Sequence, residues 1–454
     1  MILLFWILLW QLAALLVSNP IYFASPVETL RELAVQGVTA AFWQGVAGSL
    51  FRIAGGFFIA SVAAFLLAFA AYLIPLTDDI LRPFVMFLKS VPVAAVVVIL
   101  LIWWGSEHLV LCISFMVVFP NIYENVLTGL KKTDPRLLEM AKVFGIRPGA
   151  EFFWIYREAY RPYLLSAMSV SLGMAFKSGI AAEVIGLPAG SIGERLYRDK
   201  IYLNTAGVFA WIIVILLISF VTERIIISVF RMLSGIPSSC PKEIHIRPGK
   251  KDTAYRSGEG DAKCDPGADI VVEGLKKAYH DRIVVDSSFR LKAGGMYYLN
   301  APSGSGKTTL LRLLAGIEKA DEGKINCGKV SMVFQEDRLV ENANALRNLE
   351  LAGCVGDLAK EIGKVLPETV FDTPAGKLSG GEKRRLSILR AMLHPSEVLL
   401  MDEPFAGLDD DTKQRMKEYI KNNRNGRTIL IAGHDPVEET NDMERVELIN
   451  ADSL

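Results

Sequence analysis

Residues 301 to 309 have the types and spacing of a loop that binds phosphate groups. The loop reads Ala-Pro-Ser-Gly-Ser-Gly-Lys-Thr-Thr and lies between a strand-like run and a helix-like run. Glycines let backbone N–H groups approach phosphate oxygens closely, and the N-terminus of a helix adds its dipole. Lys307 would give a positive charge to the β- and γ-phosphates of a nucleotide, and the Thr308 hydroxyl can ligate Mg²⁺. Ala301 stands where the pattern usually begins with glycine, so this loop needs support from other motifs.

Further motifs follow downstream. Residues 378–382 read Leu-Ser-Gly-Gly-Glu, residues 397–404 read Glu-Val-Leu-Leu-Met-Asp-Glu-Pro, and residues 407–409 read Gly-Leu-Asp. Gln335 and His434 each end an apolar, strand-like run. Any one of these motifs is weak evidence, whereas the whole ordered set leaves little room for chance.

The ordered set resembles the nucleotide-binding domain of ATP-binding cassette (ABC) transporters, from the Walker A loop to the switch histidine. The resemblance covers about residues 268 to 454 and implies ATP and Mg²⁺ as ligands. Glu403 would orient and deprotonate the attacking water. The catalytic residues that it implies are Glu403, His434, Gln335 and Lys307. The implied nucleotide-binding residues are Tyr279, Ser303, Gly304, Ser305, Gly306, Lys307, Thr308, Thr309, Ser379, Gly380 and Gly381. The implied metal ligands are Thr308, Gln335 and Asp402.

Composition points to a membrane part joined to a soluble part. The 454 residues suggest two to four domains, and the hydrophobic content of 51% is concentrated in the first half. A net charge of zero leaves no electrostatic footprint for nucleic acid. The five cysteines lack the spacing of a zinc site.

Six apolar stretches approach the length that a bilayer requires. They cover about residues 1–17, 50–74, 84–104, 109–127, 164–185 and 206–230. The first has no basic start or clear cleavage site, so we read it as a retained helix rather than a signal peptide. An even count places both termini on one side, and a basic segment between the fourth and fifth stretches places that side in the cytoplasm. We therefore expect a multi-pass protein of a bacterial plasma membrane with both termini and the ATPase inside.

The basic segment also carries a second motif. Glu139-Met140-Ala141, followed by Gly145 and Ile155, resembles the Glu-Ala-Ala…Gly…Ile loop of ABC importer permeases. That resemblance implies a short coupling helix, within about residues 129–162, that the ATPase grips. A turn glycine at 145 would take a positive φ. The match is imperfect, because a methionine and an Arg-Glu pair replace family residues.

These features predict three parts. Residues 1–233 form an all-α, six-helix permease that resembles the nitrate/sulfonate/taurine importer class. Residues 234–267 are rich in Ser, Pro, Gly and charges and form a linker. Residues 268–454 form an α/β P-loop ATPase with a helical subdomain. Lys177 and Glu183 lie in or near the fifth stretch, six positions apart and so not on one helix face, and the sequence leaves open whether either contacts substrate.

The predicted function is that of an ABC importer subunit, which couples ATP hydrolysis to uptake of a small solute. Its expected partners are membrane lipid, an extracytoplasmic binding protein, and a second copy of the chain or a related fused chain, without nucleic acid. One alternative is an ABC exporter, although exporters usually lack the coupling-loop pattern. Another is a membrane-tethered regulatory ATPase that moves no solute. Hydrolysis stimulated by a binding protein would separate transport from regulation.

Overall fold

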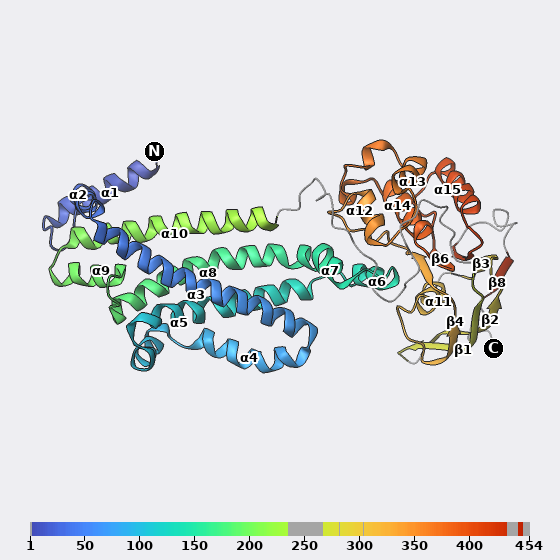
Figure 1. The fold of residues 1–454 in the computed structure, drawn as a ribbon, viewed down its shortest axis with the longest axis horizontal. Coiled ribbons are helices and arrows are strands. Elements are labelled where there is room, and N and C mark those ends of the chain that lie inside the picture. The colour runs from blue at the N-terminus through green and yellow to red at the C-terminus, as the bar shows by residue number, and fades with distance from the viewer. Residues whose placement is uncertain (1, 235–266, 281, 303, 434–443, 448–454) are drawn as a thin grey trace. The chain divides into compact units, whose positions relative to one another are not determined.

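A computed structural model describes residues 2–234, 267–280, 282–302, 304–433 and 444–447 (Figure 1). Internal contacts divide the chain into two compact units. The first combines Met1–Thr133 with Ala159–His245, and the second combines Asp134–Glu158 with Ile246–Leu454. Residues 235–266 of the predicted linker, together with Ser303 and His434, lie outside the described residues.

The first unit is entirely helical in its described part. Its helices are α1 (Ile2–Val17), α2 (Pro26–Gly37), α3 (Ala40–Leu73), α4 (Pro75–Ser90), α5 (Val93–Lys131), α8 (Arg157–Gly186), α9 (Ile192–Ile201) and α10 (Thr205–Ser234). Four helical segments in the described chain are long and apolar enough to cross a membrane: Ala40–Leu73, Val93–Lys131, Pro148–Gly186 and Thr205–Phe230. A shorter apolar helix covers Leu4–Val17. The structure therefore supports a helical membrane unit, and the predicted count of six spans is not confirmed.

The difference lies mainly in α4 and α5. Most of the predicted stretches 84–104 and 109–127 lies on α5, which joins two helical segments across a kink at Gly105. The start of the first stretch falls instead on α4, an amphipathic helix whose first turn holds Asp78 and whose last holds Lys89. Gly105, at φ 70° and ψ −176°, is the non-helical residue inside α5. The predicted boundary between the two stretches, at residues 104 to 109, contains this kink.

Small side chains let α3 pack closely on α5. Gly56, Ala60, Ala64 and Ala68 recur every four residues of α3, and all are buried. A Cβ at Gly56 would lie 2.7 Å from the Leu111 carbonyl oxygen of α5, so a larger residue would push the helices apart. This pattern of small residues four apart is common where membrane helices meet.

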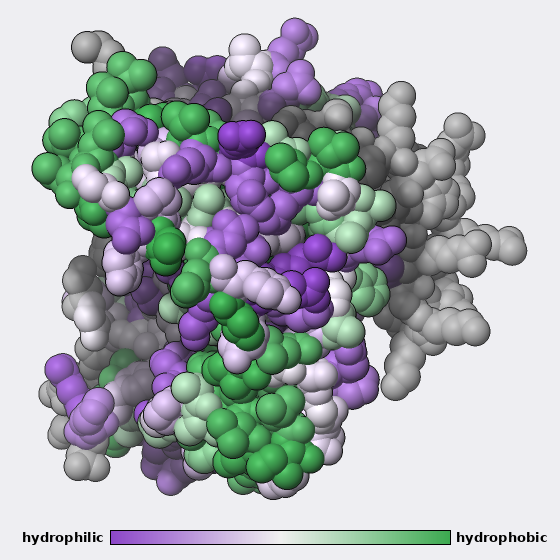
Figure 2. Space-filling view, turned by 90° about the vertical axis from the view of Figure 1, so that its left-hand side faces the viewer, coloured by the Kyte–Doolittle hydropathy of each residue, from purple (hydrophilic) through white to green (hydrophobic). Residues whose placement is uncertain are grey.

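Apolar side chains stay exposed elsewhere on this unit. On α1, Ile2 is 79% exposed and Leu16 is 78% exposed. Figure 2 shows hydrophobic groups together with hydrophilic ones on the face that it draws. Exposed apolar surface of this extent suits a protein surrounded by lipid.

Glu183 of α8 has a structural role inside the first unit. Its carboxylate is fully buried, accepts a hydrogen bond from the Ser49 hydroxyl at 2.7 Å and another from the Gly193 N–H at 3.1 Å. The Nε of Arg52 lies 3.6 Å from its other oxygen. A buried carboxylate is stable only when it is paired, and the partners of Glu183 lie on other helices. Glu183 thereby joins α8 to α3 and to the start of α9.

The second unit begins with the loop that follows α5. This loop holds α6 (Pro135–Val143), α7 (Pro148–Glu151) and the π-helix η1 (Phe152–Tyr156). Two sheets follow: an antiparallel sheet in the order β2 (Arg282–Leu291), β1 (Ile270–Tyr279), β4 (Glu322–Asn326), and a parallel sheet in the order β5 (Val330–Val333), β6 (Val398–Asp402), β7 (Thr428–Ala432), β3 (Met296–Asn300), β8 (Glu444–Glu447). Every residue of β6 and β7 is buried, as expected for strands covered on both faces.

The helices of this unit are α11 (Lys307–Leu314), α12 (Ala345–Leu351), α13 (Leu358–Val365), α14 (Gly380–Leu393) and α15 (Asp410–Asn422), with the 3₁₀ turns η2 (Glu368–Val370) and η3 (Ala375–Lys377). Residues of α12, α13 and α14, among them Leu349, Ile362 and Leu386, form a second hydrophobic core. The predicted α/β ATPase fold, with helices gathered between β5 and β6, is confirmed.

Candidate functional site

The loop between β3 and α11 has the backbone of an anion-binding loop. Gly304 and Gly306 have φ values of 80° and 88°, which disfavour other residues. A Cβ at Gly306 would also lie 2.5 Å from the Val284 carbonyl oxygen. The helix α11 starts at Lys307, so its first N–H groups point back at the loop. The Lys307 ammonium is buried and donates to the carbonyl oxygens of Ala301 and Pro302.

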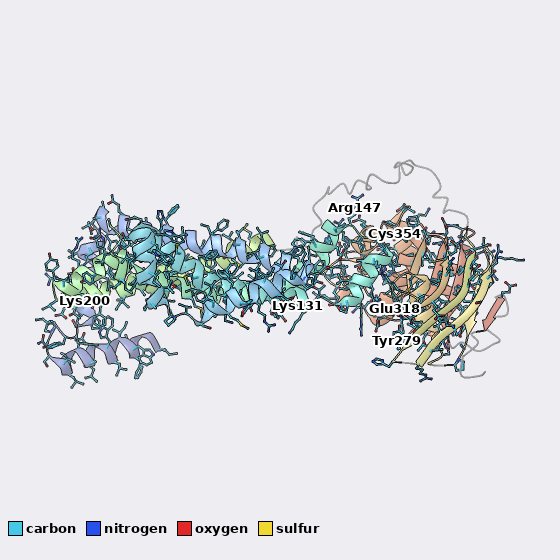
Figure 3. All side chains as sticks on the ribbon, turned by 90° about the horizontal axis from the view of Figure 1, so that it is seen from below. Lys131, Arg147, Lys200, Tyr279, Glu318 and Cys354 are labelled. Carbon is cyan, nitrogen blue, oxygen red and sulfur yellow. The ribbon has the colours of Figure 1, made fainter. Side chains whose placement is uncertain are left out.

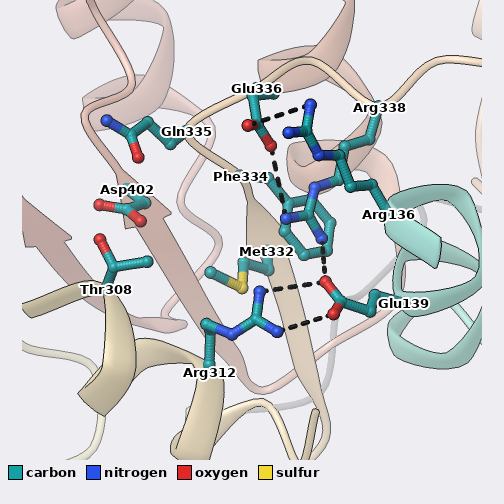
Figure 4. A pocket seen from close by; sticks show the side chains of 10 residues that line it. All are labelled: Arg136, Glu139, Thr308, Arg312, Met332, Phe334, Gln335, Glu336, Arg338 and Asp402. Atoms are coloured by element: carbon teal, nitrogen blue, oxygen red, sulfur yellow. Dashed lines mark hydrogen bonds and ion pairs between the residues drawn. The ribbon is translucent and has the colours of Figure 1, made fainter. Parts of the chain in front are cut away.

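All three predicted metal-binding residues line one cavity of about 320 Å³ (Figure 4). Thr308 comes from the start of α11, Gln335 from the segment after β5, and Asp402 from the end of β6. The carboxyl ends of parallel strands meet at one edge of the sheet, which explains why residues distant in sequence converge there.

Asp402 carries an unsatisfied oxygen in this cavity. Its Oδ2 is buried and has no hydrogen-bond partner in the described part of the chain. Burial raises the pKa of Asp402, and the Thr308 hydroxyl acts against this rise. Unpaired buried acceptors are rare and call for a partner such as an ion. A hydroxyl, an amide oxygen and a carboxylate are the oxygen ligands that Mg²⁺ uses, so this residue set fits the metal.

Glu403 follows Asp402 with a strained backbone. Its φ of 47° is unusual for a residue with a side chain, and its N–H donates to the Ala432 carbonyl of β7 at 2.8 Å. Strain of this kind persists only where the surrounding structure imposes it, and it gathers at functional sites. Burial lowers the pKa of Lys307, while the charges of Glu403 and Asp402 raise it. The two carboxylates and the ammonium therefore share one electrostatic environment.

Arg384 is a site residue that the motif reading missed. It lies on α14, is 3% exposed, and its guanidinium donates to the carbonyls of Phe334 at 2.6 Å, Asp402 at 2.9 Å and Pro404 at 2.9 Å. It also donates to the carbonyl of Glu403. One cation thereby holds together the ends of β5 and β6, where the candidate catalytic residues lie. The sequence offered one signal for Arg384, which is its position in the helix that begins at the Leu-Ser-Gly-Gly-Glu motif.

Ser379 is the N-cap of that helix. Its hydroxyl accepts the Glu382 N–H at 3.3 Å, and the Glu382 carboxylate accepts the Ser379 N–H at 2.8 Å, which makes a capping box. Ser379 and Gly380 are exposed, and neither they nor Gly381 line the cavity that holds Asp402. The predicted nucleotide-binding residues are thus divided between the α11 loop and a separate helix N-terminus.

Tyr279 ends β1 and is 39% exposed. Its hydroxyl donates to Glu318, and both residues are labelled in Figure 3. Burial, followed by the hydrogen bond to Glu318, raises the pKa of Tyr279 to about 12. The ring is therefore held in place at the end of β1, the central strand of the antiparallel sheet, and its predicted contact with adenine stays a prediction.

The helix α6 binds to the ATPase through charges (Figure 4). The two Glu139 oxygens accept hydrogen bonds from Arg312 of α11 at 2.7 and 3.0 Å, and Arg338 donates to one of them at 2.6 Å. Burial tends to raise the pKa of Glu139, but the hydrogen bonds from Arg312 and Arg338 lower it overall. Arg136 adds an ion pair with Glu336 at 3.3 Å. Arg312 lies on α11, the helix that begins with Lys307, so α6 contacts that helix directly.

Apolar contacts complete this docking. Met140 is 1% exposed and Phe144 is 3% exposed, and both belong to the ATPase core. The Phe144 ring meets the His394 ring edge-on, with centroids 5.2 Å apart. Gly145 ends the helix with a φ of 60°, and the next N–H, of Ile146, bonds the Ala141 carbonyl at 2.9 Å. The predicted positive φ of Gly145 is confirmed.

Comparisons with known proteins agree with this geometry. Residues 284–406 match the ABC transporter family, and residues 56–226 match the family described as "Binding-protein-dependent transport system inner membrane component". The aliphatic sulfonates import ATP-binding protein SsuB 1 of Nocardia farcinica is 35% identical over 191 residues, which are 40% of this chain and 78% of that protein. The chain belongs to the ABC transporter family. SsuB 3 of Pseudomonas savastanoi is also 35% identical, over 200 residues that are 40% of this chain and 73% of that protein.

This ABC transporter chain therefore contains an ATP hydrolase and a permease together. Similarity of the ATPase alone does not decide the direction of transport. The Nod factor export ATP-binding protein I of Ralstonia nicotianae is likewise 35% identical, over 189 residues that are 36% of this chain and 59% of that protein. The permease match decides it, because that family serves binding-protein-dependent systems. The chain is thus of the importer type, and neither the exporter nor the regulatory alternative is favoured.

Proposed function

We propose that this chain is half of a dimeric importer that takes up a small solute of the nitrate/sulfonate/taurine class across the plasma membrane. The observation that carries the proposal is the docking of Glu139 on Arg312, in a chain that matches both a permease and an ATPase family. The names of the sulfonate-import relatives support the solute class. We assign residues 1–233 to the permease and 268–454 to the ATPase, with both termini in the cytoplasm.

In the proposed site, the loop N–H groups and Lys307 bind the β- and γ-phosphates of ATP. Thr308, Gln335 and Asp402 would hold Mg²⁺, which supplies charge to stabilise the transferred phosphoryl group. Glu403 takes the proton of the attacking water, and its fixed backbone keeps the carboxylate beside the metal ligands. His434 contacts the γ-phosphate, and Tyr279 stacks on adenine.

Coupling would run from the phosphate-binding helix to the permease through α6. A change at Lys307 moves α11, and Arg312 on the same helix moves Glu139 through a bidentate ion pair. Such a pair fixes orientation as well as distance, so it can transmit a rotation. The buried Met140 and Phe144 keep α6 seated meanwhile.

The separation of the two candidate anion-binding elements supports the proposed dimer. Ser379 and its two glycines do not line the cavity that holds Thr308 and Asp402. A second chain would bring its own α14 N-terminus to the nucleotide, and a two-fold axis would complete both sites at once. A binding protein outside the membrane would deliver the solute.

The test is the full chain reconstituted in liposomes with the variant Glu403→Gln. Loss of the positioned base should lower ATP turnover by roughly 10²–10⁴-fold and leave ATP affinity intact, because Lys307 and the loop are unchanged. Glu418→Gln, which alters an exposed carboxylate of α15, is the control and should keep full turnover. Turnover of Glu403→Gln within about threefold of wild type would remove Glu403 from its role. ATP-dependent uptake of ³⁵S-labelled butanesulfonate, stimulated by a binding protein, tests the direction.

A further inference from the structure

Tyr279 is joined to the helix α6 by a chain of hydrogen bonds through one carboxylate and one guanidinium. The carboxylate is that of Glu318, in the turn between α11 and β4, and it accepts on both of its oxygens. One oxygen accepts from the Tyr279 hydroxyl (Figure 3), and the other accepts from Nε of Arg312. The other two nitrogens of Arg312 donate to Glu139 of α6 at 2.7 and 3.0 Å (Figure 4). All four residues belong to the second unit.

The backbone around Glu318 makes further contacts in both directions. We name residues 316–321, which lie between α11 and β4, the connector. At the start of the connector, the Gly316 carbonyl accepts a hydrogen bond from Lys142 of α6 at 2.7 Å. At its other end, the Asp321 carboxylate accepts the N–H of the residue before Tyr279 at 2.8 Å. The connector therefore contacts α6 at one end and the end of β1 at the other.

The bonds of this chain are of a kind that fixes the groups they join. The side chains of Arg312 and Glu318 are each 22% exposed, and the Glu318 N–H also donates to the Arg312 carbonyl at 3.4 Å. Charge-assisted hydrogen bonds are stronger than neutral ones, and salt screens partly buried pairs weakly. Tyr279 is 39% exposed, so a base can stack on its ring while the hydroxyl stays on Glu318. A base that restricts the ring therefore also restricts Arg312.

We propose that Glu318 is a positioning residue through which binding of the adenine base strengthens the docking of α6 on the ATPase. The base holds the Tyr279 ring, the phenol keeps the Glu318 carboxylate in line with Arg312, and Arg312 then presents its other two donors to Glu139. The proposal rests on the proposed function, in which Tyr279 stacks on adenine. It adds a second route to the one that runs from the phosphates along α11, because this route responds to the base alone.

The experiment compares ATP with ribose 5-triphosphate, which carries the same phosphates and no base. Hydrogen–deuterium exchange is measured on the full chain in nanodiscs for the segment 134–147, which contains α6. EDTA prevents hydrolysis, and each ligand is present at about ten times its own dissociation constant, so that most sites are filled. In wild type, ATP should slow exchange of this segment about fivefold or more beyond ribose 5-triphosphate, which is the lower end of usual coupling between sites.

Two variants break the chain of hydrogen bonds at different places. Tyr279→Phe keeps the ring and removes the hydroxyl, and Glu318→Gln leaves one acceptor oxygen where two are needed. In both variants the difference between ATP and ribose 5-triphosphate should disappear, whereas an ion pair that only holds the connector in place would leave that difference unchanged. Glu322→Gln is the matched control, because Glu322 follows the connector, is 66% exposed at its side chain and pairs with Lys276 instead. It should keep the full difference.

A wild-type difference that persists in either Glu318→Gln or Tyr279→Phe would overturn the proposal, and so would the lack of a difference in wild type. Exchange of α15, which lies outside the chain of bonds, shows whether each variant is folded, and Tyr279→Phe decides if Glu318→Gln is not.

The affinity of Tyr279→Ala for ATP tests the stacking separately. Unchanged affinity would overturn the adenine contact of the proposed function and this proposal with it. Weaker binding of ATP to Tyr279→Ala, together with no effect of the base on α6, would overturn the role of Glu318 alone. Solute uptake and ATP turnover are not measured here, so a failure of the importer assignment or of the Glu403→Gln test leaves this result unchanged.

Discussion

Replacing Arg384 with methionine should loosen the edge of the parallel sheet where β5 and β6 end and the candidate catalytic residues lie. The guanidinium is buried and donates to the backbone carbonyls at the ends of β5 and β6, among them those of Phe334, Asp402 and Pro404. Methionine fills similar space but donates nothing. The carbonyls would then lose a charged donor in a site that water does not reach.

The expected loss of local stability follows from the removal of a buried charged donor. Breaking a buried charged network by removing one member costs about 3–5 kcal/mol. Since 1.4 kcal/mol corresponds to a factor of ten, local opening should become roughly 10²- to 4 × 10³-fold more frequent. ATP turnover should fall as well, because Asp402 and Glu403 depend on these backbone positions.

Hydrogen–deuterium exchange of the full chain in nanodiscs measures this directly. The peptides to follow cover residues 330–337 and 398–406, which include the Glu403 N–H that bonds the Ala432 carbonyl. Arg385→Met is the matched control. Arg385 donates to the carbonyls of Val365 at 2.7 Å and Gly381 at 3.3 Å, away from the two strands, so its loss should cost about 1 kcal/mol and leave those peptides protected.

If the exchange rates of the two segments in Arg384→Met stayed within about threefold of those in wild type, the reasoning would be refuted. A loss of about 3 kcal/mol should change these rates by more than a hundredfold. Equal acceleration in Arg385→Met would refute it too, since the effect would then belong to the helix and not to the bridging cation.

The remaining predictions concern coupling and assembly. Glu139→Arg should lower solute uptake in liposomes by about tenfold or more while ATP binding persists. Combining Glu139→Arg with Arg312→Glu should recover part of the uptake, and a double variant that takes up no more solute than the single one would remove the pair from the coupling path. Gly145→Val forces a β-branched residue to φ 60°, which costs about 1–3 kcal/mol, so ATP hydrolysis should no longer drive uptake; normal uptake would contradict this. Mixing inactive Lys307→Ala chains with inactive Ser379→Arg chains should restore some ATP hydrolysis. A dimer that contains one chain of each variant has one intact composite site, made of the unchanged loop of one chain and the unchanged α14 N-terminus of the other. An active, purely monomeric ATPase in light scattering would rule out that arrangement.

Local sequence was sufficient for features whose physics is local. The glycines of the phosphate-binding loop and Gly145 could be predicted, because a positive φ is a property of one residue and its neighbours. The strands β6 and β7 could be predicted from apolar runs, since a parallel sheet buries both faces. The order of the motifs then determined the α/β fold and the family.

Local patterns could not give what depends on residues distant in the chain. Hydropathy suggested six spans, but it measures only whether a stretch is apolar. The structure places most of two such stretches on α5, on either side of the non-helical Gly105, and four helices of the described residues suit a membrane. The spacing of Lys177 and Glu183 predicted different helix faces. Only the packing of α3 and α9 against α8 decided that Glu183 is structural.

The candidate site at the ends of β5 and β6 also combines features that the sequence predicts with features that only the packing decides. Its types and order, from Lys307 to Glu403, were readable, because phosphate and Mg²⁺ require specific groups. The clamp by Arg384 and the pairing of Glu139 with Arg312 were not, because hydrogen bonds between segments 18 to 173 residues apart form only once the sheet and α6 have been packed together. The sequence determined which chemistry this chain can perform, and tertiary packing decided which charges of distant segments are paired and which helix of the ATPase contacts α6.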